Sequence, residues 1–276
     1  MKSNLLTRVI IAFIFGPLIL FLTLVGRLPF LLLIELFITL GLWEFCYLAE
    51  QKSFQIPKWI LLILGILSGI SVYLWGEQAL IILPLSAVYL TAFLFVVKGR
   101  TENTTSDLAV TTFALFYVAG LFGFLILLRE LPNRLGLDYK IGGLWIVYLL
   151  ISIWSCDTFA YFIGAPLGKH RLSPAVSPKK TVEGFFGGIL GAVAAAFFSY
   201  YVFFKSGGLE HLLVISIFVS LVGQVGDLAE SLFKRDAKIK DISNLIPGHG
   251  GILDRFDSLL FVSPIVYYYL KLFVYR

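Results

Sequence analysis

Charged residues are scarce in this chain. Aspartate, glutamate, lysine and arginine make up 14% of its 276 residues, whereas hydrophobic residues make up 59% and include 26 phenylalanines. With a mean hydropathy of +0.91, the composition lies outside the range of soluble globular domains and inside that of polytopic membrane proteins. No soluble basic domain is present to bind nucleic acid, so we expect no nucleic-acid partner.

Cysteine is equally rare. Cys46 and Cys156 both lie within apolar segments, which indicates neither a disulfide nor a thiolate metal site. The sequence also lacks an internal repeat of fixed period and a low-complexity linker. We therefore expect a single integral membrane domain over residues 1–276.

Long apolar segments, in contrast, recur from end to end. A helix needs about 20 apolar residues to cross a hydrocarbon core, and a helix satisfies its own backbone polar groups in lipid. The sequence thus predicts an all-α fold with about nine transmembrane helices. They are expected near residues 8–25, 28–50, 58–76, 78–97, 107–129, 143–164, 181–204, 211–233 and 257–274.

Lysine and arginine are distributed unevenly between alternate loops. Most of the 22 lie at the amino terminus or in the loops after the second, fourth, sixth and eighth predicted spans. Cytoplasmic loops of membrane proteins carry this excess, so we expect a cytosolic amino terminus. The same count places residues 234–256 in the cytosol, where anionic metabolites and lipid head groups are found.

A basic segment precedes the seventh predicted span. Ser177 suits an N-cap and Pro178 the first helical position, so we expect the helix to begin there. Free N–H groups at such a start favour an anion, which Lys179 and Lys180 would also attract. The alternative is that both lysines only anchor the span at the lipid surface. Four glycines follow at spacings that allow close helix packing: Gly184, Gly187, Gly188 and Gly191.

Carboxylates recur at the cytosolic ends of the last two predicted spans. Asp227, Glu230 and Lys234 lie on one stripe of a helix, while Asp254 and Asp257 open the last span. If the two helices bring Asp227 and Asp254 together, they form a Mg²⁺-nucleotide site, because Mg²⁺ takes one or two carboxylates plus substrate phosphates. The alternatives are an ion pair of Asp227 with Lys234 and an N-cap role for Asp254.

The loop between these spans holds candidates for phosphate binding. Gly250 and Gly251 let backbone amides approach a phosphate, and Lys240 and Arg255 add positive charge. We interpret His249 as a hydrogen-bond donor to a phosphate. General acid-base catalysis and a structural hydrogen bond to the backbone are the alternatives.

Three further carboxylates lie inside predicted spans. Asp157 is the one acidic residue of the sixth span, where a hydrogen bond between helices and a substrate or metal role are equally plausible interpretations. Glu35 and Glu44 in the second span have no motif around them, so neither receives a role.

These residues form a pattern that resembles a known signature. The pattern is Ser231-x-Phe233-Lys234-Arg235-x4-Lys240-Asp241-x-Ser243-x2-Ile246-Pro247-x-His249-Gly250-Gly251-x2-Asp254-Arg255-x-Asp257. It is similar to the signature of the phosphatidate cytidylyltransferase, or CDP-diacylglycerol synthase, family, without departure from it. The resemblance extends to Asp157-x2-Ala160-Tyr161-x2-Gly164 and to Ser177-Pro178-Lys179-Lys180-Thr181-x-Glu183-Gly184. It is concentrated in residues 157–257, and the first half is similar in hydropathy alone.

The resemblance implies transfer of the cytidylyl group of CTP to phosphatidic acid, giving CDP-diacylglycerol and pyrophosphate for phospholipid biosynthesis. It further implies Mg²⁺, a homodimer, and an active site on the cytosolic face of the cell (inner) membrane. A second cation beside Mg²⁺ is left open. Asp227 and Asp254 match the family's metal-binding aspartates.

The residue predictions fall into three overlapping groups. Catalytic roles are predicted for Asp227, Asp254, Lys234, Arg235, Lys240 and His249, CTP or phosphate binding for Lys179, Lys180, Asp157, Gly250, Gly251 and Arg255, and metal binding for Asp227, Asp254 and Asp257.

Two other functions compete with this hypothesis. A CTP-dependent kinase of a polyprenol or similar lipid alcohol would transfer the γ-phosphoryl group and would need a base for a neutral hydroxyl. The closeness of the signature disfavours it. A transporter would more often show paired broken helices at the midplane and internal symmetry. Here the charged cluster lies at one membrane edge, and no repeat is found.

Overall fold

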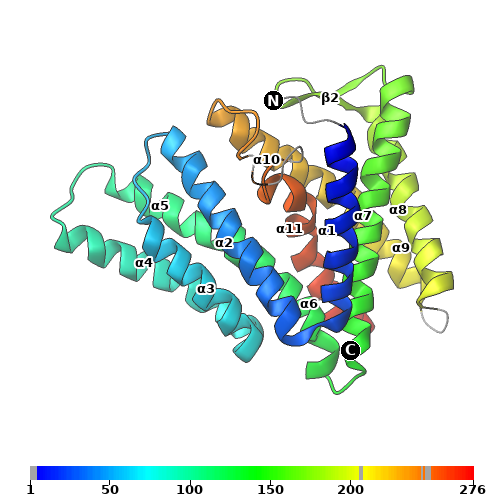
Figure 1. Ribbon diagram of the computed structural model, residues 1–276, viewed down its shortest axis with the longest axis horizontal. Helices are drawn as coiled ribbons and strands as arrows, with labels where there is room; N and C mark the ends of the chain where they lie inside the picture. Colours follow the sequence, from blue (N-terminus) through cyan, green and yellow to red (C-terminus); the bar gives the residue numbers. More distant parts are fainter. Residues whose placement is uncertain (1–4, 205–207, 244, 246–249) are drawn as a thin grey trace. The chain divides into compact units, whose positions relative to one another are not determined.

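The computed structural model describes residues 5–204, 208–243, 245 and 250–276, with side chains from residue 13 onward (Figure 1). The described residues form helices joined by loops, and one short β-hairpin. The first half holds α1 (Leu5–Val25), α2 (Arg27–Gln51), α3 (Lys58–Trp75), η1 (Gly76–Gln78), α4 (Ala79–Val97), α5 (Thr104–Ala114), η2 (Leu115–Gly120) and α6 (Leu121–Arg134). The second half holds α7 (Tyr139–Leu167), β1 (Arg171–Ser173), β2 (Ser177–Thr181), α8 (Val182–Val202), α9 (Leu209–Phe218), η3 (Val219–Gly223), α10 (Gln224–Asp236), α11 (Leu253–Tyr269) and η4 (Leu270–Val274).

Seven helical runs of the described chain are long and apolar enough to cross a membrane. They are Arg27–Gln51, Lys58–Val97, Thr104–Arg134, Tyr139–Leu167, Val182–Val202, Leu209–Asp236 and Leu253–Val274. The all-α class is thereby confirmed, whereas the number nine is not. One reason for the difference is that Lys58–Val97 contains both α3 and α4. The other is that the described side chains of α1 cover a shorter apolar stretch, Phe13–Val25.

The chain divides into two compact units, and each takes two separate stretches of sequence. The first holds the chain up to Glu130 together with Asp236–Arg255, and the second holds Leu131–Arg235 together with Phe256–Arg276. The division cuts across α6 and α11 and therefore does not follow element boundaries. That the whole chain acts as a single membrane domain stays a prediction.

In the first unit, α2 packs against α3, and α3 packs against α4. The contact between α2 and α3 is close because a Cβ added at Gly65 would lie 2.2 Å from Leu42 Cδ1. Arg129 of α6 has no exposed surface and donates hydrogen bonds to the carbonyls of Thr23, at 2.8 Å, and Leu24, at 3.1 Å. A guanidinium thus satisfies the carbonyl groups that a helix leaves open at its carboxyl end.

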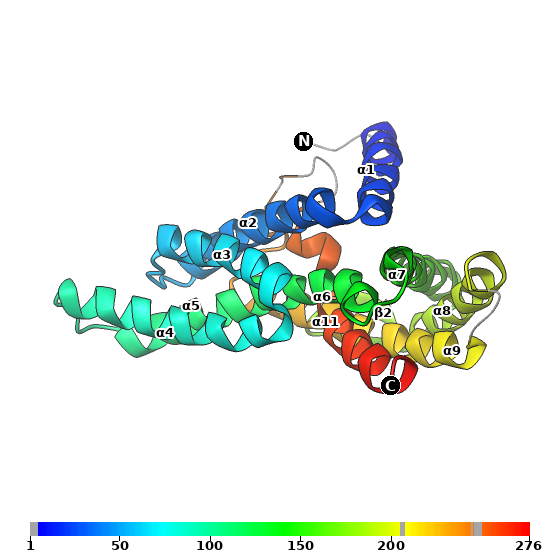
Figure 2. The ribbon, with the colours of Figure 1, turned by 90° about the horizontal axis from the view of Figure 1, so that it is seen from below.

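In the second unit, α7 and α8 lie side by side (Figures 1 and 2). Added Cβ atoms would come within 2.9 Å of α7 atoms at four glycines of α8, as the sequence predicted: Gly184, Gly187, Gly188 and Gly191. The carbonyl oxygens of Ser155 and Ala160 are among these atoms. Two backbones approach so closely only where one of them lacks side chains.

The start of α8 differs from the prediction. The helix begins at Val182, and Thr181 is its N-cap, with its hydroxyl accepting the Gly184 N–H at 3.1 Å. The expectation that Ser177 caps this helix and that Pro178 opens it was wrong. Both residues belong to β2, which pairs antiparallel with β1. Strand pairing therefore engages this backbone, and the helix starts only after it.

Candidate active site

α10 carries charges of both signs in an order that suits a helix. Asp227 lies in its first turn, and Lys234 and Arg235 lie in its last. Negative charge near the amino end and positive charge near the carboxyl end are both favourable to the helix dipole. The π-helical segment η3 directly precedes α10, and such segments are frequent at functional sites.

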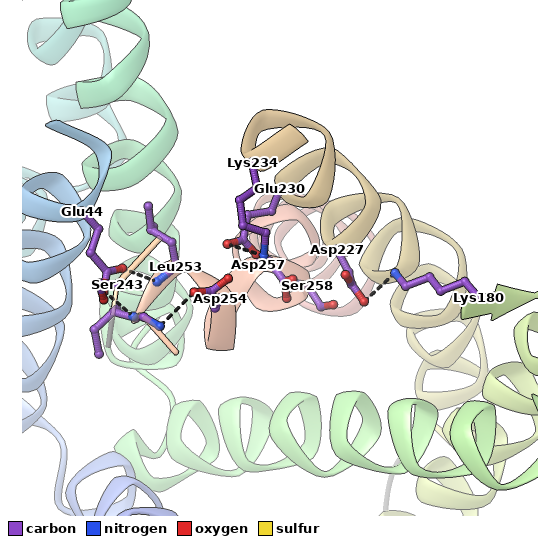
Figure 3. A network of polar contacts seen from close by, with 12 residues as sticks. Glu44, Lys180, Asp227, Glu230, Lys234, Ser243, Leu253, Asp254, Asp257 and Ser258 are labelled. Carbon is purple, nitrogen blue, oxygen red and sulfur yellow. Dashed lines mark hydrogen bonds and ion pairs between the residues drawn. The ribbon is translucent and has the colours of Figure 1, made fainter. Parts of the chain in front are cut away.

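Asp227 forms an ion pair with Lys180 (Figure 3). Lys180 Nζ lies 2.5 Å from Asp227 Oδ2, so the hairpin strand β2 supplies the cation and α10 the carboxylate. The alternative in which Lys234 pairs with Asp227 was wrong. Lys234 instead lies 3.3 Å from Glu230 Oε1, one turn back on the same helix. A pair four residues apart is the ordinary neighbour pair of a helix surface.

Glu230 joins this site, although no role was predicted for it. Its side chain is 1% exposed, and its carboxyl group lies beside that of Asp257, which also feels the negative charge of Asp227. Neighbouring carboxylates repel one another, and a bound cation would relieve that repulsion. The signal for Glu230 was its position three residues after Asp227, on the predicted stripe.

α10 and α11 approach closely where these carboxylates lie. A Cβ added at Gly226 would lie 2.8 Å from the carbonyl oxygen of Asp257. One turn earlier, the Ser258 hydroxyl donates to the Gly223 carbonyl at 2.9 Å. The missing side chain of Gly226 and the hydroxyl of Ser258 together fix the position of Asp257 relative to α10.

The start of α11 organises a second group of polar contacts, which belongs to the first compact unit. Asp254 Oδ2 accepts the Gly251 N–H at 2.9 Å. Because α11 begins at Leu253, Asp254 lies in its first turn, and the alternative that it is the N-cap was wrong. Gly250 has a φ of +83°, a conformation that favours glycine. Contact of Gly250 and Gly251 with a phosphate stays a prediction, and in this structure the Gly251 amide is directed to Asp254.

Glu44 of α2 belongs to this second group, and no role was predicted for it. It has no exposed surface and accepts hydrogen bonds from Ser243, Ile252 and Leu253. No local motif surrounds Glu44, because its partners lie about 200 residues later in the chain. Only the signature around Ser243 could have indicated that a distant acceptor exists.

The hairpin before α8 is held by contacts with Glu183 of α8 and Arg235 of α10. Glu183 accepts the backbone N–H of Lys169 at 3.1 Å, and its Oε1 lies 2.7 Å from His170 Nδ1. Arg235 of α10 donates to the Val176 carbonyl in the hairpin turn at 3.4 Å. The hairpin is therefore attached at its base by Glu183 and at its turn by Arg235.

The remaining candidates are spread over the surface or lie elsewhere. Exposed side chains belong to Asp157 of α7, Lys179 of β2, Lys240 and Arg255.

His249 lies outside the described residues, and its role stays a prediction. Asp227 belongs to one compact unit and Asp254 to the other. Their approach at the membrane edge therefore stays a prediction as well.

No three His, Cys, Asp or Glu side chains of the described chain are arranged to hold a metal ion by themselves. Mg²⁺ does not require such a group, since it keeps several waters and takes one or two carboxylates plus substrate phosphates. The neighbouring carboxyl groups of Glu230 and Asp257, beside the charge of Asp227, are hard oxygen donors. This donor set fits Mg²⁺.

Comparison with known proteins agrees with the signature. A sequence model described as the cytidylyltransferase family matches residues 6–273. The chain is 40% identical to the phosphatidate cytidylyltransferase of Bacillus subtilis over 276 residues, 99% of this chain and 98% of the relative. It is 34% identical to that of Staphylococcus epidermidis over 274 residues, 96% of this chain and 97% of the relative. The corresponding Staphylococcus aureus protein is 31% identical over 275 residues, 96% of this chain and 97% of the relative.

The resemblance predicted from residues 157–257 is confirmed and extends over nearly the whole chain. The chain belongs to the cytidylyltransferase family.

Proposed function

We propose that this protein transfers the cytidylyl group of CTP to phosphatidic acid, giving CDP-diacylglycerol and pyrophosphate for phospholipid biosynthesis. The observation that carries the proposal is the cluster of Asp227, Glu230 and Asp257 with Lys180 and Lys234. It lies inside the signature segments of a chain whose full-length relatives are named phosphatidate cytidylyltransferase. Carboxylates alternating with ammonium groups suit a reaction between two phosphates.

In the reaction, a phosphate oxygen of phosphatidic acid forms a bond to the α-phosphorus of CTP. The bond from that phosphorus to the oxygen bridging the α and β phosphates breaks, and pyrophosphate leaves with both bonding electrons. The attacking phosphate monoester is ionised near neutral pH, so no strong base is needed. Catalysis then depends on positioning and on neutralising negative charge.

The side chains of the cluster divide this work. Asp227 and Asp257, together with Asp254 of the signature, would hold Mg²⁺. When bound, the ion supplies positive charge to the phosphate oxygens. Lys180 fixes the Asp227 carboxylate, and Lys234 fixes Glu230. Lys179, Lys240, Arg235 and Arg255 are positioned in signature segments and neutralise the phosphates of CTP and the leaving group.

The same proposal includes the membrane arrangement. We propose nine crossings, with α3 and α4 as two of them, because each has close to 20 residues and the pair packs as a hairpin. The distribution of lysine and arginine supports a cytosolic amino terminus and an active site on the cytosolic face of the cell membrane. A homodimer is proposed on the family resemblance alone.

The decisive test follows the two ends of the CTP triphosphate separately. Purified protein is incubated with phosphatidic acid, Mg²⁺ and CTP labelled at either the α or the γ phosphate, and label in the lipid phase is measured. We expect α label in lipid and γ label in released pyrophosphate. Transfer of γ label to an added lipid alcohol would instead establish a lipid kinase. Absence of any transfer would contradict both enzymes and favour a transporter.

A further inference from the structure

The feature that leads beyond the reaction is the carboxylate of Glu44, which belongs to α2 in the first half of the chain. Its side chain has no exposed surface. Burying a carboxylate in a membrane helix is unfavourable unless hydrogen bonds or cations compensate it. The structure provides three hydrogen-bond donors, and all three come from residues 243–253 at the other end of the sequence (Figure 3).

The first two donors are backbone amides at the start of α11. Glu44 Oε1 accepts the Ile252 N–H, and Oε2 accepts the Leu253 N–H, both at 2.9 Å. The first N–H groups of any helix have no partner within the helix, and the helix dipole favours negative charge there. Glu44 therefore satisfies the amino end of α11 from a different helix.

The third donor lies before the loop that leads to α11. The Ser243 hydroxyl donates to Glu44 Oε1 at 2.5 Å and accepts the Leu245 N–H at 3.3 Å. One carboxylate thus holds residues on both sides of positions 246–249. This gives Ser243, a signature residue, a defined physical task.

The carboxylate of Glu44 leaves no room for a side chain at position 251. A Cβ added at Gly251 would lie 2.4 Å from Glu44 Oε1 and 2.6 Å from Oε2. Gly251 is therefore required for the approach of the loop to Glu44. The Gly251 N–H meanwhile donates to Asp254, so three consecutive amides are divided between two carboxylates.

From this division we propose that Glu44 is a positioning residue for the cytidylyl transfer. By holding the start of α11, Glu44 sets the direction of the Asp254 carboxylate. Glu44 accepts the Ile252 and Leu253 amides, and Asp254 accepts that of Gly251. Without Glu44, the Ile252 and Leu253 amides lose their acceptor, and Asp254, in the first turn of α11, turns toward them. The inference rests on the proposed function in assigning Asp254 to Mg²⁺ binding.

The test compares two isosteric substitutions on the same helix. Glu44→Gln replaces one acceptor oxygen by an NH₂ group that faces backbone donors. Glu35→Gln is the matched control, because Glu35 is also a carboxylate of α2, and it packs against Gly69 of α3 rather than against the loop. Both full-length proteins are purified in the same detergent, and kcat, the KM for CTP and the Mg²⁺ concentration for half-maximal activity are measured.

We expect Glu44→Gln to lower kcat and to raise the Mg²⁺ requirement, each by about tenfold or more, as loss of a partner behind a metal ligand does. Glu35→Gln should stay within about twofold of the unchanged protein, since Glu35 contacts Gly69 of α3 and leaves the start of α11 unchanged. Equal behaviour of the two variants overturns the inference. Should Glu44→Gln fail to fold, Ser243→Ala removes one donor and is expected to change the Mg²⁺ requirement in the same direction, and no change there overturns the inference.

A second readout does not depend on the metal assignment. Hydrogen exchange of the peptide covering residues 250–256 should be faster in Glu44→Gln than in Glu35→Gln, because the Ile252 and Leu253 amides lose their acceptors. Unchanged exchange overturns the inference by itself. If exchange accelerates while Asp254→Asn keeps normal Mg²⁺ activation, the metal role of Asp254 in the proposed function fails and the claim that Glu44 directs a metal ligand is overturned, although its hold on α11 is retained.

Discussion

Asp254 combines two tasks that a substitution can separate. Its Oδ2 accepts the Gly251 N–H, which a neutral amide oxygen can also do, whereas binding Mg²⁺ needs the negative charge. We expect Asp254→Asn to fold and to lose about a hundredfold or more in kcat, because loss of a metal ligand should cost at least as much as loss of a partner behind one. Steady-state turnover and thermal unfolding of the purified variant are the measurements. Turnover with normal Mg²⁺ dependence would remove Asp254 from the metal site.

Lys180 is the residue whose positive charge Asp227 meets directly. We expect Lys180→Ala to raise the KM for CTP and to lower kcat, since the Asp227 carboxylate loses the partner that fixes it. The control is Lys98→Ala, which removes an exposed lysine outside the signature segments. Kinetics and expression are measured for both. A loss of yield with unchanged kinetics would support lipid anchoring as the task of Lys180.

Residue identity alone indicated part of this site. Asp227 and Lys180 were both recognised from the sequence, but the ion pair between them was not, because 46 residues of the chain lie between Lys180 and Asp227. Glu44 was not assigned, because a carboxylate in an apolar helix is informative only when its donors are known, and two of its three donors are backbone amides that carry no sequence signal.

At the level of elements, two glycines face α11 with different amounts of space, Gly226 of α10 and Gly223 of η3. A Cβ at Gly226 would lie 2.8 Å from a backbone oxygen, whereas at Gly223 the nearest atoms lie at 3.5 Å, an ordinary contact. We expect Gly226→Ala to destabilise the protein by about 1–3 kcal/mol, as overpacking does, and to lower activity by displacing Asp257. Gly223→Ala should be tolerated.

Thermal unfolding in detergent, with turnover measured alongside, compares the two glycine variants directly. If Gly223→Ala is as harmful as Gly226→Ala, helix flexibility rather than close approach explains the glycines.

Apolar segment positions were predicted well at this level, because hydropathy is a property of the segment itself. The helix start at Ser177 was not, since a local cap pattern contains no information about strand pairing. In the hairpin, residues 177–181 return alongside 171–173, and Glu183 accepts hydrogen bonds from the amides of Lys169 and His170. Such a return is a tertiary property.

For the whole molecule, orientation in the membrane is the untested prediction with the widest consequence. Cys46 and Cys156 are 1% and 3% exposed, so the protein offers a low background for thiol labelling. We expect Lys240→Cys to react with a membrane-impermeant reagent in inverted vesicles, because the loop of Lys240 is assigned to the cytosol. Leu137→Cys should react in intact cells, because the loop of Leu137 is assigned to the opposite side. The unsubstituted protein is the control. Labelling with the two sides exchanged would invert the proposed topology.

The membrane class followed from composition at once, whereas the division into two compact units did not. Each unit joins an early and a late stretch of chain, and composition carries no record of such pairing. Similarly, the number of crossings depends on how α3 and α4 are separated, which hydropathy over Lys58–Val97 does not decide.

The distance along the chain between Glu44 and its donors has a consequence for biogenesis. Ribosomes deliver α2 to the membrane first, and the Ser243 hydroxyl follows 199 residues later. Until the carboxyl-terminal segment arrives, the Glu44 carboxylate is without the three donors that compensate its burial. A chain released early therefore carries an exposed defect that quality-control proteases can recognise, and completion of α11 removes it.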